Sequence, residues 1–285
     1  MPTEIEEKWI SIGVAWCLAY SQFQTATSET SSGNLSKDTI DSWRTSLRNQ
    51  TLPADNVWKK YLDTAEAIKT FFYATDEKDQ DVSNRRSPGD ISQCIKNNNL
   101  EHSKLGLIYG GVTRVKGYIL ESADLQEIRG GSALLDRINL KDLPAIFEGE
   151  TFEKSDGTPL VSAELSKALI PQLIIYSTGG NILALCPEAC VQALSNAIEK
   201  RYAQETLTAD ACAVGEVFNP VELYAGLLTD APLRTLWKDD VAQQFDSNPV
   251  LQAYFGLSQY ENVASFTEAF YKRKNFGELV GRLTN

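Results

Sequence analysis

The sequence predicts an α+β fold. Between residues 105 and 214, short apolar runs alternate with stretches of helical spacing, which gives the order strand, helix, strand, hairpin, strand, helix, strand. A Gly-Gly pair between two of the apolar runs predicts the hairpin, because glycine adopts the positive φ angles of a tight turn. Helical spacing before and after this region predicts further helices on both flanks.

The first 100 residues are expected to be helical, with polar connections. Apolar residues are dense from Ile5 to Phe23, which predicts a helix with a broad buried face. Ser and Thr dominate Thr25 to Ser36, so a linker is expected there. Asp55 to Thr75 carries apolar residues at intervals of three and four and predicts a second helix. Asp76 to Asn99 is charged and contains a Pro-Gly pair, which is typical of an exposed connector.

The central region carries the strand signals. Leu105 to Tyr109 is an apolar run that ends at Gly110-Gly111 and predicts a buried strand. The runs Leu173 to Ser177 and Ile182 to Cys186 are joined by Thr178-Gly179-Gly180-Asn181 and predict the hairpin. The remaining expected elements are helices over 112–120, 124–138 and 187–203, with Pro187 at a first helical position, and a strand over 208–214.

This order of elements is the split pattern of ferredoxin-like domains, in which two helices cover one face of a sheet. We therefore divide the chain into a helical N-terminal region with a charged connector over 1–100, a ferredoxin-like domain over 101–218 and a helical segment over 219–285. The last segment keeps its helical spacing to the end without an evident cap, as if the chain continued elsewhere.

Charge and hydropathy exclude several classes of protein. The 285 residues include 27 basic and 38 acidic side chains, which gives a net charge of −11. Nucleic-acid binders usually carry a basic footprint, so autonomous, non-specific binding to DNA or RNA is not expected, while a local basic face inside a larger assembly stays open. The most apolar stretch, Leu169 to Pro187, is interrupted by polar residues and falls short of the roughly 20 apolar residues of a membrane span.

The N-terminus and the cysteines predict a cytoplasmic location. Met1 to Trp9 carries three glutamates where a secretory signal needs basic residues. The five cysteines are sparse and lack a Cys-x-x-Cys pair, so we interpret them as reduced thiols that mostly fill the core. Cys186 and Cys190 are four residues apart, but no third ligand lies near them and a zinc site is not expected.

The single histidine of the chain removes whole classes of mechanism. A His-Asp phosphohydrolase needs several histidines around two metals, and an HExxH hydrolase needs two histidines on one helix. His102 stands in the polar run Lys96 to Lys104. We interpret it as a solvated loop histidine rather than as part of a Ser-His-Asp or Cys-His arrangement.

The predicted sheet has the plan of the palm of polymerases and nucleotide cyclases. Two-metal chemistry in such a palm needs two carboxylates, one at the end of the first strand and one at the hairpin tip. Here these places read Tyr109-Gly110-Gly111 and Gly179-Gly180-Asn181, which supply no acid. A neutral amide binds Mg²⁺ much more weakly than a carboxylate does, so phosphoryl transfer by this palm alone is not expected.

Two segments carry a resemblance to a known family: IYGGVTRVKGYILESADLQEIRGGSALLDRIN, from Ile108 to Asn139, and IIYSTGGNILALCPE, from Ile174 to Glu188. They resemble the large subunit of type III CRISPR effector complexes. In that family one palm with a Gly-Gly-Asp-Asp hairpin makes cyclic oligoadenylates from ATP, and a degenerate partner palm has a Gly-Gly-Asn hairpin. This chain is similar to the degenerate partner over about residues 105–285.

Two further stretches fit the resemblance. Arg129-Gly130-Gly131-Ser132 matches the family's helix after the first strand, where a small-residue pair lets the helix pack tightly. Phe276-Gly277-Glu278-Leu279 resembles the region that follows the degenerate palm.

The resemblance implies a non-catalytic, palm-containing subunit or fragment of an antiviral effector complex. Its palm is expected to pack against an active palm and to contribute to an ATP pocket, with Mg at the shared interface. Other subunits and, indirectly, guide and target RNA are the expected partners. The chain lacks the histidines of the family's nuclease domain, the Gly-Gly-Asp-Asp palm and the cysteine zinc site, so DNA cleavage and cyclic oligoadenylate synthesis are not carried over; a short form, a split gene product or a fragment remains.

The candidate nucleotide-binding residues are Gly110, Gly111, Ser132, Gly179, Gly180 and Asn181. In the family the degenerate hairpin faces the adenosine pocket, so the amides of Gly179 and Gly180 would approach a phosphate without side-chain obstruction. The same hairpin residues also suit a plain type I′ turn, and Ser132 with Arg129 suits helix packing and surface charge. No catalytic or metal-ligating residue is assigned, and the acids Asp124, Glu127 and Asp136 are expected on a helix.

Two other functions and several basic residues stay open. Arg114, Lys116 and Lys272-Arg273-Lys274 suit contacts with phosphate or RNA, and ordinary exposed helix charges explain them as well. A divergent nucleotidyl cyclase, making cyclic (oligo)adenylate from ATP, would take its carboxylates from unexpected positions or from a dimer partner. A stand-alone nucleotide sensor would bind ATP without turnover.

Overall fold

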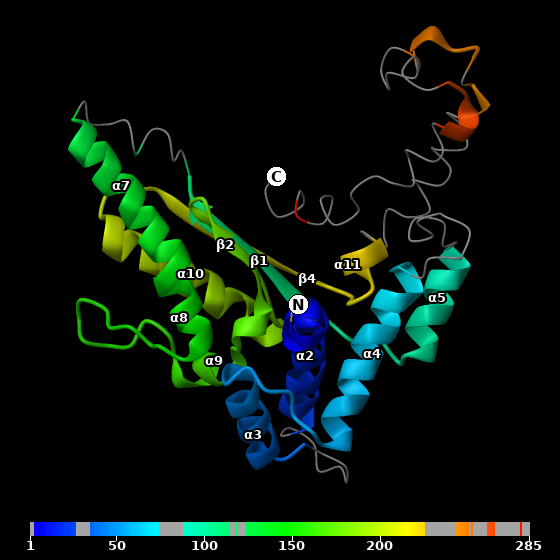
Figure 1. The fold of residues 1–285 in the computed structure, drawn as a ribbon, viewed down its shortest axis with the longest axis horizontal. Coiled ribbons are helices and arrows are strands. Elements are labelled where there is room, and N and C mark those ends of the chain that lie inside the picture. The colour runs from blue at the N-terminus through cyan, green and yellow to red at the C-terminus, as the bar shows by residue number, and fades with distance from the viewer. Residues whose placement is uncertain are drawn as a thin grey trace. The chain divides into compact units, whose positions relative to one another are not determined.

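The structure is a computed structural model of the 285-residue chain (Figure 1). It describes residues 3–26, 35–73, 88–113, 118, 124–225, 243–244, 246–250, 252, 261–265 and 280. Some expectations fall outside these residues: most of the linker over 25–36, most of the helix over 112–120, Arg114, Lys116, the basic run 272–274, the motif 276–279 and most of the segment 219–285.

The described residues form two compact units. The first contains residues 3–66 and 103–218, and the second contains residues 67–102 with the described residues after 218. The first unit holds the sheet and every candidate nucleotide-binding residue. The division into regions over 1–100, 101–218 and 219–285 stays a prediction.

A four-stranded antiparallel sheet confirms the α+β prediction (Figure 1). Its strands are β1 (Leu105–Val112), β2 (Ile174–Thr178), β3 (Asn181–Pro187) and β4 (Ala211–Phe218), in the spatial order β2-β3-β1-β4. Strand β1 is central and pairs antiparallel with both β3 and β4. The connection from β1 to β2 contains helices, β2 and β3 form the predicted hairpin, and a helix connects β3 to β4.

Helices pack on both faces of the sheet. Helix α10 (Val191–Thr206) lies on one face, where Ile198 approaches Gly110 of β1. Helix α2 (Trp9–Ala26) lies on the other face, where its Gly13 approaches the side chain of Leu185 in β3. Side chains alternate along a strand, so β1 is buried on both sides, and its burial is nearly continuous. The sequence predicted this run correctly as a buried strand.

Tryptophan side chains anchor α2 to the rest of its unit. The indole Nε1 of Trp16, which is fully buried, donates a hydrogen bond to the Ala168 carbonyl at 2.8 Å. The indole of Trp9 donates to the Ile174 carbonyl at the start of β2, also at 2.8 Å. Trp16 therefore contributes a large apolar surface to the core, Trp9 is half-buried, and the single polar atom of each ring is satisfied.

The N-terminal helices differ in part from the prediction. The helix expected over 5–23 is divided into α1 (Glu4–Glu7), with a capping box at Thr3, and α2, with the break at Lys8. Helix α4 (Asn56–Tyr73) confirms the helix expected over 55–75. The side chain of Asp55 accepts hydrogen bonds from the Val57 and Trp58 amides and so caps the start of α4.

Several helices stand where the sequence did not predict any, and two of them lie in the first 100 residues. Helix α3 (Lys37–Arg48) is capped by Ser36, whose hydroxyl accepts a hydrogen bond from the Thr39 amide at 3.1 Å. Helix α5 (Pro88–Asn97) occupies part of the stretch interpreted as an exposed connector, so that interpretation is wrong for these residues. Ile91 and Cys94 are three residues apart and both buried, which gives α5 an apolar side despite its charged neighbours.

Shorter elements complete the described residues. Helix α7 (Leu125–Arg137) confirms the helix expected over 124–138, and a π-helix (Ile138–Asp142) and α8 (Leu143–Glu148) follow it directly. The others are α9 (Ala163–Ala168), α11 (Glu222–Ala225) and the 3-10 turns Pro171–Leu173 and Glu188–Cys190. Figure 1 shows α7 beside α10.

Strand β4 begins and ends later than the expected strand over 208–214. Helix α10 continues to Thr206 and ends at Leu207, which has a positive φ of 58°. The chain then reaches β1 only at Asp210, whose carbonyl accepts a hydrogen bond from the Thr113 amide at 2.7 Å. At the outer edge of β4, the Ala213 amide donates to the carboxylate of Glu199 in α10 at 2.8 Å.

Two further expectations can be compared with the structure. His102 is exposed in a turn, which confirms its interpretation as a solvated loop histidine. Within the part of the chain that the structure describes, no helix has the length and apolar character needed to cross a membrane.

Thiol reactivity provides a test of the packing. Cys17, Cys94, Cys186 and Cys190 are buried, and Cys212 is exposed. Burial raises the pKa of the Cys190 thiol to about 11 and raises that of Cys186 as well, which suppresses their reactive thiolates. With a chromogenic disulfide reagent at pH 8, we expect one thiol to react rapidly in the native protein and all five to react in denaturant.

Cys212→Ser is the matched variant for this experiment. It should remove the rapid phase and leave four thiols that react only after unfolding. Rapid reaction of two or more thiols in native protein would contradict the described burial.

Candidate functional site

The predicted hairpin is closed by two glycines with left-handed backbone conformations. Gly179 has a φ of 64° and Gly180 a φ of 85°. Positive φ at both central residues defines the type I′ turn that suits the twist of a two-residue hairpin. A Cβ on Gly179 would meet nothing within 4 Å, so backbone conformation alone accounts for this glycine.

Close contact between strands accounts for the glycines at the end of β1. Gly111 pairs with Asn181 across β1 and β3. A Cβ on Gly111 would lie 2.2 Å from Oδ1 of Asn181 and 2.4 Å from the Gly180 carbonyl oxygen, so a side chain does not fit. A Cβ on Gly110 would lie 2.8 Å from the Ala213 Cβ. Five of the six candidate residues therefore gather at one end of the sheet.

Ser132, the sixth candidate residue, lies on an exposed part of α7. Arg129 and Gly130 beside it are also exposed. A Cβ on Gly130 would meet no atom within 4 Å, and on Gly131 the nearest would be a ring carbon of Tyr118 at 3.6 Å. The expectation that this glycine pair permits tight helix packing is therefore wrong in the described structure.

The carbonyl of Gly180 points into the protein rather than toward solvent. It accepts a hydrogen bond from the Val112 amide at 3.0 Å, and it lies 3.2 Å from the Tyr202 hydroxyl, whose single proton it shares with a closer acceptor. Gly180 is buried, whereas Gly179 is exposed. The two glycines of the turn thus differ in role: Gly179 faces outward, and Gly180 fixes the turn to the core.

Tyr202 and Asn139 form a buried polar pair behind the hairpin. The Tyr202 hydroxyl donates to Oδ1 of Asn139 at 2.8 Å, and Nδ2 of Asn139 donates to the Leu135 carbonyl at 2.8 Å. Both side chains are fully buried. Burial raises the pKa of the Tyr202 phenol far above its ordinary value, so the hydroxyl remains a hydrogen-bond donor.

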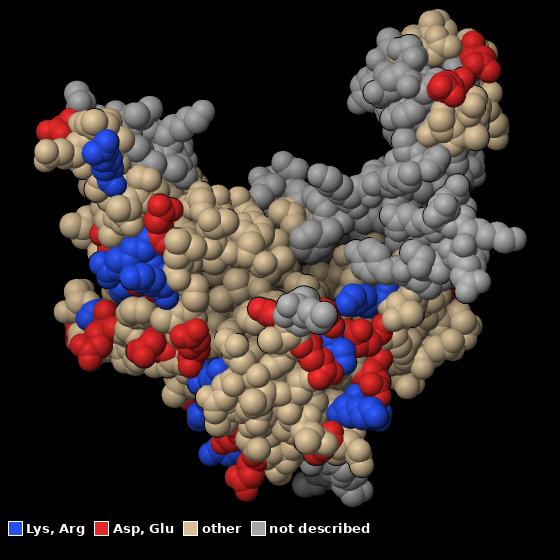
Figure 2. Space-filling view, viewed as in Figure 1, with Lys and Arg blue, Asp and Glu red and all other residues tan. Residues whose placement is uncertain are grey.

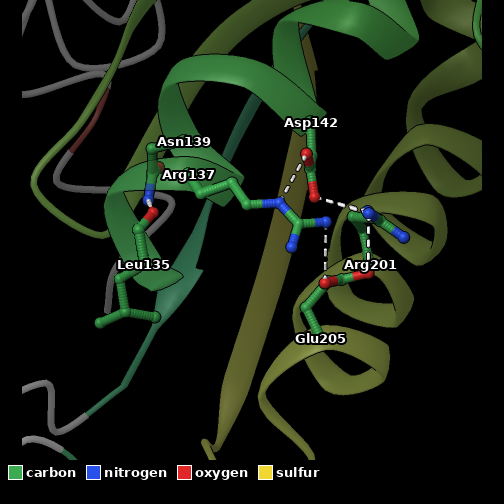
Figure 3. Close-up of polar contacts among 6 residues, drawn as sticks. All are labelled: Leu135, Arg137, Asn139, Asp142, Arg201 and Glu205. Atoms are coloured by element: carbon green, nitrogen blue, oxygen red, sulfur yellow. Dashed lines mark hydrogen bonds and ion pairs between the residues drawn. The ribbon is translucent and has the colours of Figure 1, made fainter. Parts of the chain in front are cut away.

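An ion cluster lies beside this pair, between the π-helix and α10 (Figure 3). Arg201 donates to Oδ2 of Asp142 from Nε at 3.1 Å and from a terminal nitrogen at 2.6 Å. The same terminal nitrogen lies 2.7 Å from Glu205. Arg137 reaches Glu205 at 3.1 Å and Asp142 at 3.7 Å, so two cations and two anions alternate around the cluster.

Burial makes this cluster sensitive to the loss of Arg201 or Asp142. The side chains of Arg201 and Asp142 are only 8% and 9% exposed. Removal of one partner from a buried ion pair costs about 3–5 kcal/mol, because the other charge stays desolvated. The Arg201 guanidinium also lies 4.0 Å from the centre of the Phe152 ring, a cation–π contact.

Sequence reasoning missed all of these polar residues. Arg201 and Glu205 stand four apart on one helix, a spacing that signals an ion pair. Asn139 and Asp142 stand just before Pro144, which signals a helix with an irregular hydrogen-bond pattern. Neither signal says that the two sets lie against each other.

The oxygen atoms of the hairpin turn do not form a magnesium site by themselves. Residues 178–181 offer hydroxyl, carbonyl and amide oxygens, all neutral, and the Gly180 carbonyl is already engaged. Mg²⁺ sites in proteins use carboxylates. Among the described residues, no cluster of three or more His, Cys, Asp or Glu side chains has the arrangement of a metal site. Asp124, Glu127 and Asp136 are exposed on or next to α7.

Surface charge near α7 is mixed. Figure 2 shows Lys and Arg side chains directly beside Asp and Glu side chains on this part of the visible face. Opposite charges on neighbouring side chains cancel much of each other's electrostatic field. The face around α7 therefore lacks the continuous basic character of a nucleic-acid footprint in its described residues.

Comparison with protein-family models, with curated proteins and with solved structures gives no match to this chain.

A pair of glycine substitutions tests the packing at the hairpin. Gly111→Ala should lower the free energy of unfolding by about 1–3 kcal/mol, because its Cβ would overlap Asn181 and Gly180. Gly130→Ala, in an open part of α7, should raise it by about 0.5–1 kcal/mol through helix propensity. Urea unfolding, monitored by tryptophan fluorescence, measures both changes in the free energy of unfolding. Equal effects of the two substitutions would refute the close contact.

Proposed function

We propose that this chain is a non-catalytic, palm-containing subunit or fragment of a type III CRISPR antiviral effector complex. In this proposal it packs against an active palm and contributes to an ATP pocket. One observation carries the proposal: the Gly179-Gly180-Asn181 turn and the Gly110-Gly111 pair lie together at one end of the sheet. In an active palm these two places hold the metal-binding carboxylates.

The strand order supports a ferredoxin-like palm as the finer description of the fold. The order β2-β3-β1-β4, with every neighbouring pair antiparallel, agrees with a split pattern of two strand–helix–strand units. The β2–β3 hairpin joins these two strand–helix–strand units, and α10 is the helix that connects the strands β3 and β4 of the second. A turn at the end of such a sheet is accessible to a partner placed across it, since Gly179 is exposed.

Because the oxygen atoms of the turn are neutral, this proposal assigns metal binding to the active palm of the partner. Any Mg²⁺ that accompanies ATP at a shared interface would take its carboxylate ligands from the active palm, and this chain would supply backbone contacts. Synthesis of cyclic oligoadenylate therefore belongs to the complex in this proposal. The proposed location is the cytoplasm, where guide RNA and the other subunits assemble.

Affinity purification from native cells tests membership of the complex. A tagged copy of the chain is purified under mild salt, and the bound RNA is sequenced. We expect short RNAs that share a common repeat-derived end, together with further subunits at fixed stoichiometry. Cells with an untagged copy serve as the control. Recovery of a chain free of RNA and of stoichiometric partners would refute the proposal.

Incubation of the purified chain with ATP and Mg²⁺ or Mn²⁺ tests the absence of turnover. Since the turn supplies no carboxylate, we expect no cyclic or linear adenylate product by liquid chromatography. Product formation that disappears in Asn181→Ala would favour the divergent nucleotidyl cyclase. Product formation that Asn181→Ala leaves unchanged, and that stays with the chain through repurification, would also favour a cyclase, with its carboxylates at other positions.

A further inference from the structure

The face of the sheet opposite α10 is covered only in part. Gly106 and Gly110 of β1 face α10, so Leu107 and Tyr109 face the other way. Helix α2 covers this second face near the start of β1, where Leu107 and Leu185 are fully buried (Figure 1). Toward the hairpin, the same face carries half-buried and exposed side chains. The second face is therefore accessible at its hairpin end.

Strand pairing aligns four side chains of this face in one row across the sheet. Tyr109 pairs with Leu183 of β3 and with Val214 of β4, and Leu183 also pairs with Tyr176 of β2. Paired residues of antiparallel strands project from the same face. We call Tyr176, Leu183, Tyr109 and Val214 the tyrosine row. Neighbouring strands lie about 4.8 Å apart, so roughly 10 Å separates the backbones of the two tyrosines.

The tyrosine side chains are the accessible part of this row between β2 and β1. Tyr176 is 38% exposed and Tyr109 is half-buried, whereas Leu183 between them is 1% exposed. Burial and, less strongly, the neighbouring Tyr109 raise the pKa of the Tyr176 phenol, so this phenol is neutral at physiological pH. The surface offered here is therefore aromatic rather than aliphatic, and it is uncharged.

A second row, nearer the hairpin, is small and polar. Its members pair across the four strands in the same way and are Thr178, Asn181, Gly111 and Cys212. The two rows are two residues apart along a strand, or about 7 Å. The Nδ2 of Asn181 donates to the Gly179 carbonyl at 3.4 Å, the long limit of a hydrogen bond. The Asn181 amide can therefore exchange this weak bond for a bond to a ligand.

The absence of charge limits what these two rows can bind. None of their residues is acidic or basic. Glu216, two residues beyond Val214 in β4, is exposed and acidic. A phosphate group would therefore meet no cation in these two rows, whereas a neutral planar ring would meet aromatic surface and an amide.

We propose that the tyrosine row binds a nucleobase, which stacks on the rings of Tyr109 and Tyr176 and turns its polar edge toward the amide of Asn181. Every base has a π-face, and aromatic side chains on an open sheet are a general means of holding unpaired bases. A side-chain amide donates and accepts at once, as the edge of adenine requires. The sugar and any phosphate lie toward solvent. This base site follows from the sheet face alone and does not depend on membership of the proposed complex.

Titration of the isotope-labelled chain with adenosine, followed by amide NMR spectra, tests the base site. We expect saturable shifts at the amides of Tyr109, Leu183 and Val214, and none in α3. ATP without Mg²⁺ should bind no more tightly than adenosine, because the two rows offer no cation to its phosphates. Ribose 5-phosphate, which lacks the base, should cause no shift. Absence of saturable shifts with adenosine, or equal shifts with ribose 5-phosphate, would overturn the proposal.

Tyr176→Ala and Tyr176→Phe form a matched pair of variants. Tyr176 lies in an edge strand and is 38% exposed, so its loss removes little core volume. The alanine variant should bind adenosine about tenfold more weakly, which is typical for the loss of one stacked ring, and the phenylalanine variant should bind within about twofold of the parent. Parent-like binding by the alanine variant would show that the ring does not hold the base.

A short single-stranded oligoadenylate distinguishes the source of the base. Tighter binding of the oligomer than of adenosine, weakened by Tyr176→Ala, supports the site and identifies an RNA strand as the source. Equal binding of the two, again weakened by Tyr176→Ala, supports the site and identifies a free nucleoside or nucleotide. Oligomer binding that Tyr176→Ala leaves unchanged would place the bases elsewhere and overturn the proposal.

Discussion

The buried ion pair between Arg201 and Asp142 is the constraint on which the hairpin end of the sheet depends. Both charges have left water, and their attraction for each other at 2.6 Å offsets part of their desolvation, while Glu205 and the half-exposed Arg137 complete a neutral set around them. The pair fixes α10 against the π-helix, and Tyr202, the next residue on α10, then meets Asn139. The glycines of the turn set its backbone conformation, and groups on these two helices contact it from the core side.

The glycines at this end of the sheet have separate causes, and this limits what they say about ligands. Gly110 and Gly111 are explained by contacts with Ala213 and Asn181, and Gly180 is committed to the core through its carbonyl. Gly179 alone combines a left-handed conformation with open surroundings. If a ligand or a partner approaches the turn, the backbone at Gly179 is the part that the fold leaves accessible.

Sequence periodicity predicted the sheet and the hairpin because strand burial and turn glycines are local signals. Helix α3 was missed since its buried residues, Ile40, Trp43 and Leu47, are sparse among polar ones and its cap at Ser36 follows a Ser/Thr-rich stretch. The buried polar network could not be predicted from the sequence for a different reason. Arg201 and Asp142 are 59 residues apart in the chain, and Tyr202 and Asn139 are 63 apart, so only the folded topology brings them together.

The bond between Glu199 and the Ala213 amide has a consequence for solubility. Ala213 is in an outermost strand, where free amides can recruit strands from other molecules and start fibril growth. A strand from another molecule could pair with this amide only after it displaced the Glu199 carboxylate. The carboxylate would then lose its hydrogen-bond donor. The opposite margin is short, at five residues, and irregular in register. Both edge strands thus have features that disfavour self-association by backbone pairing.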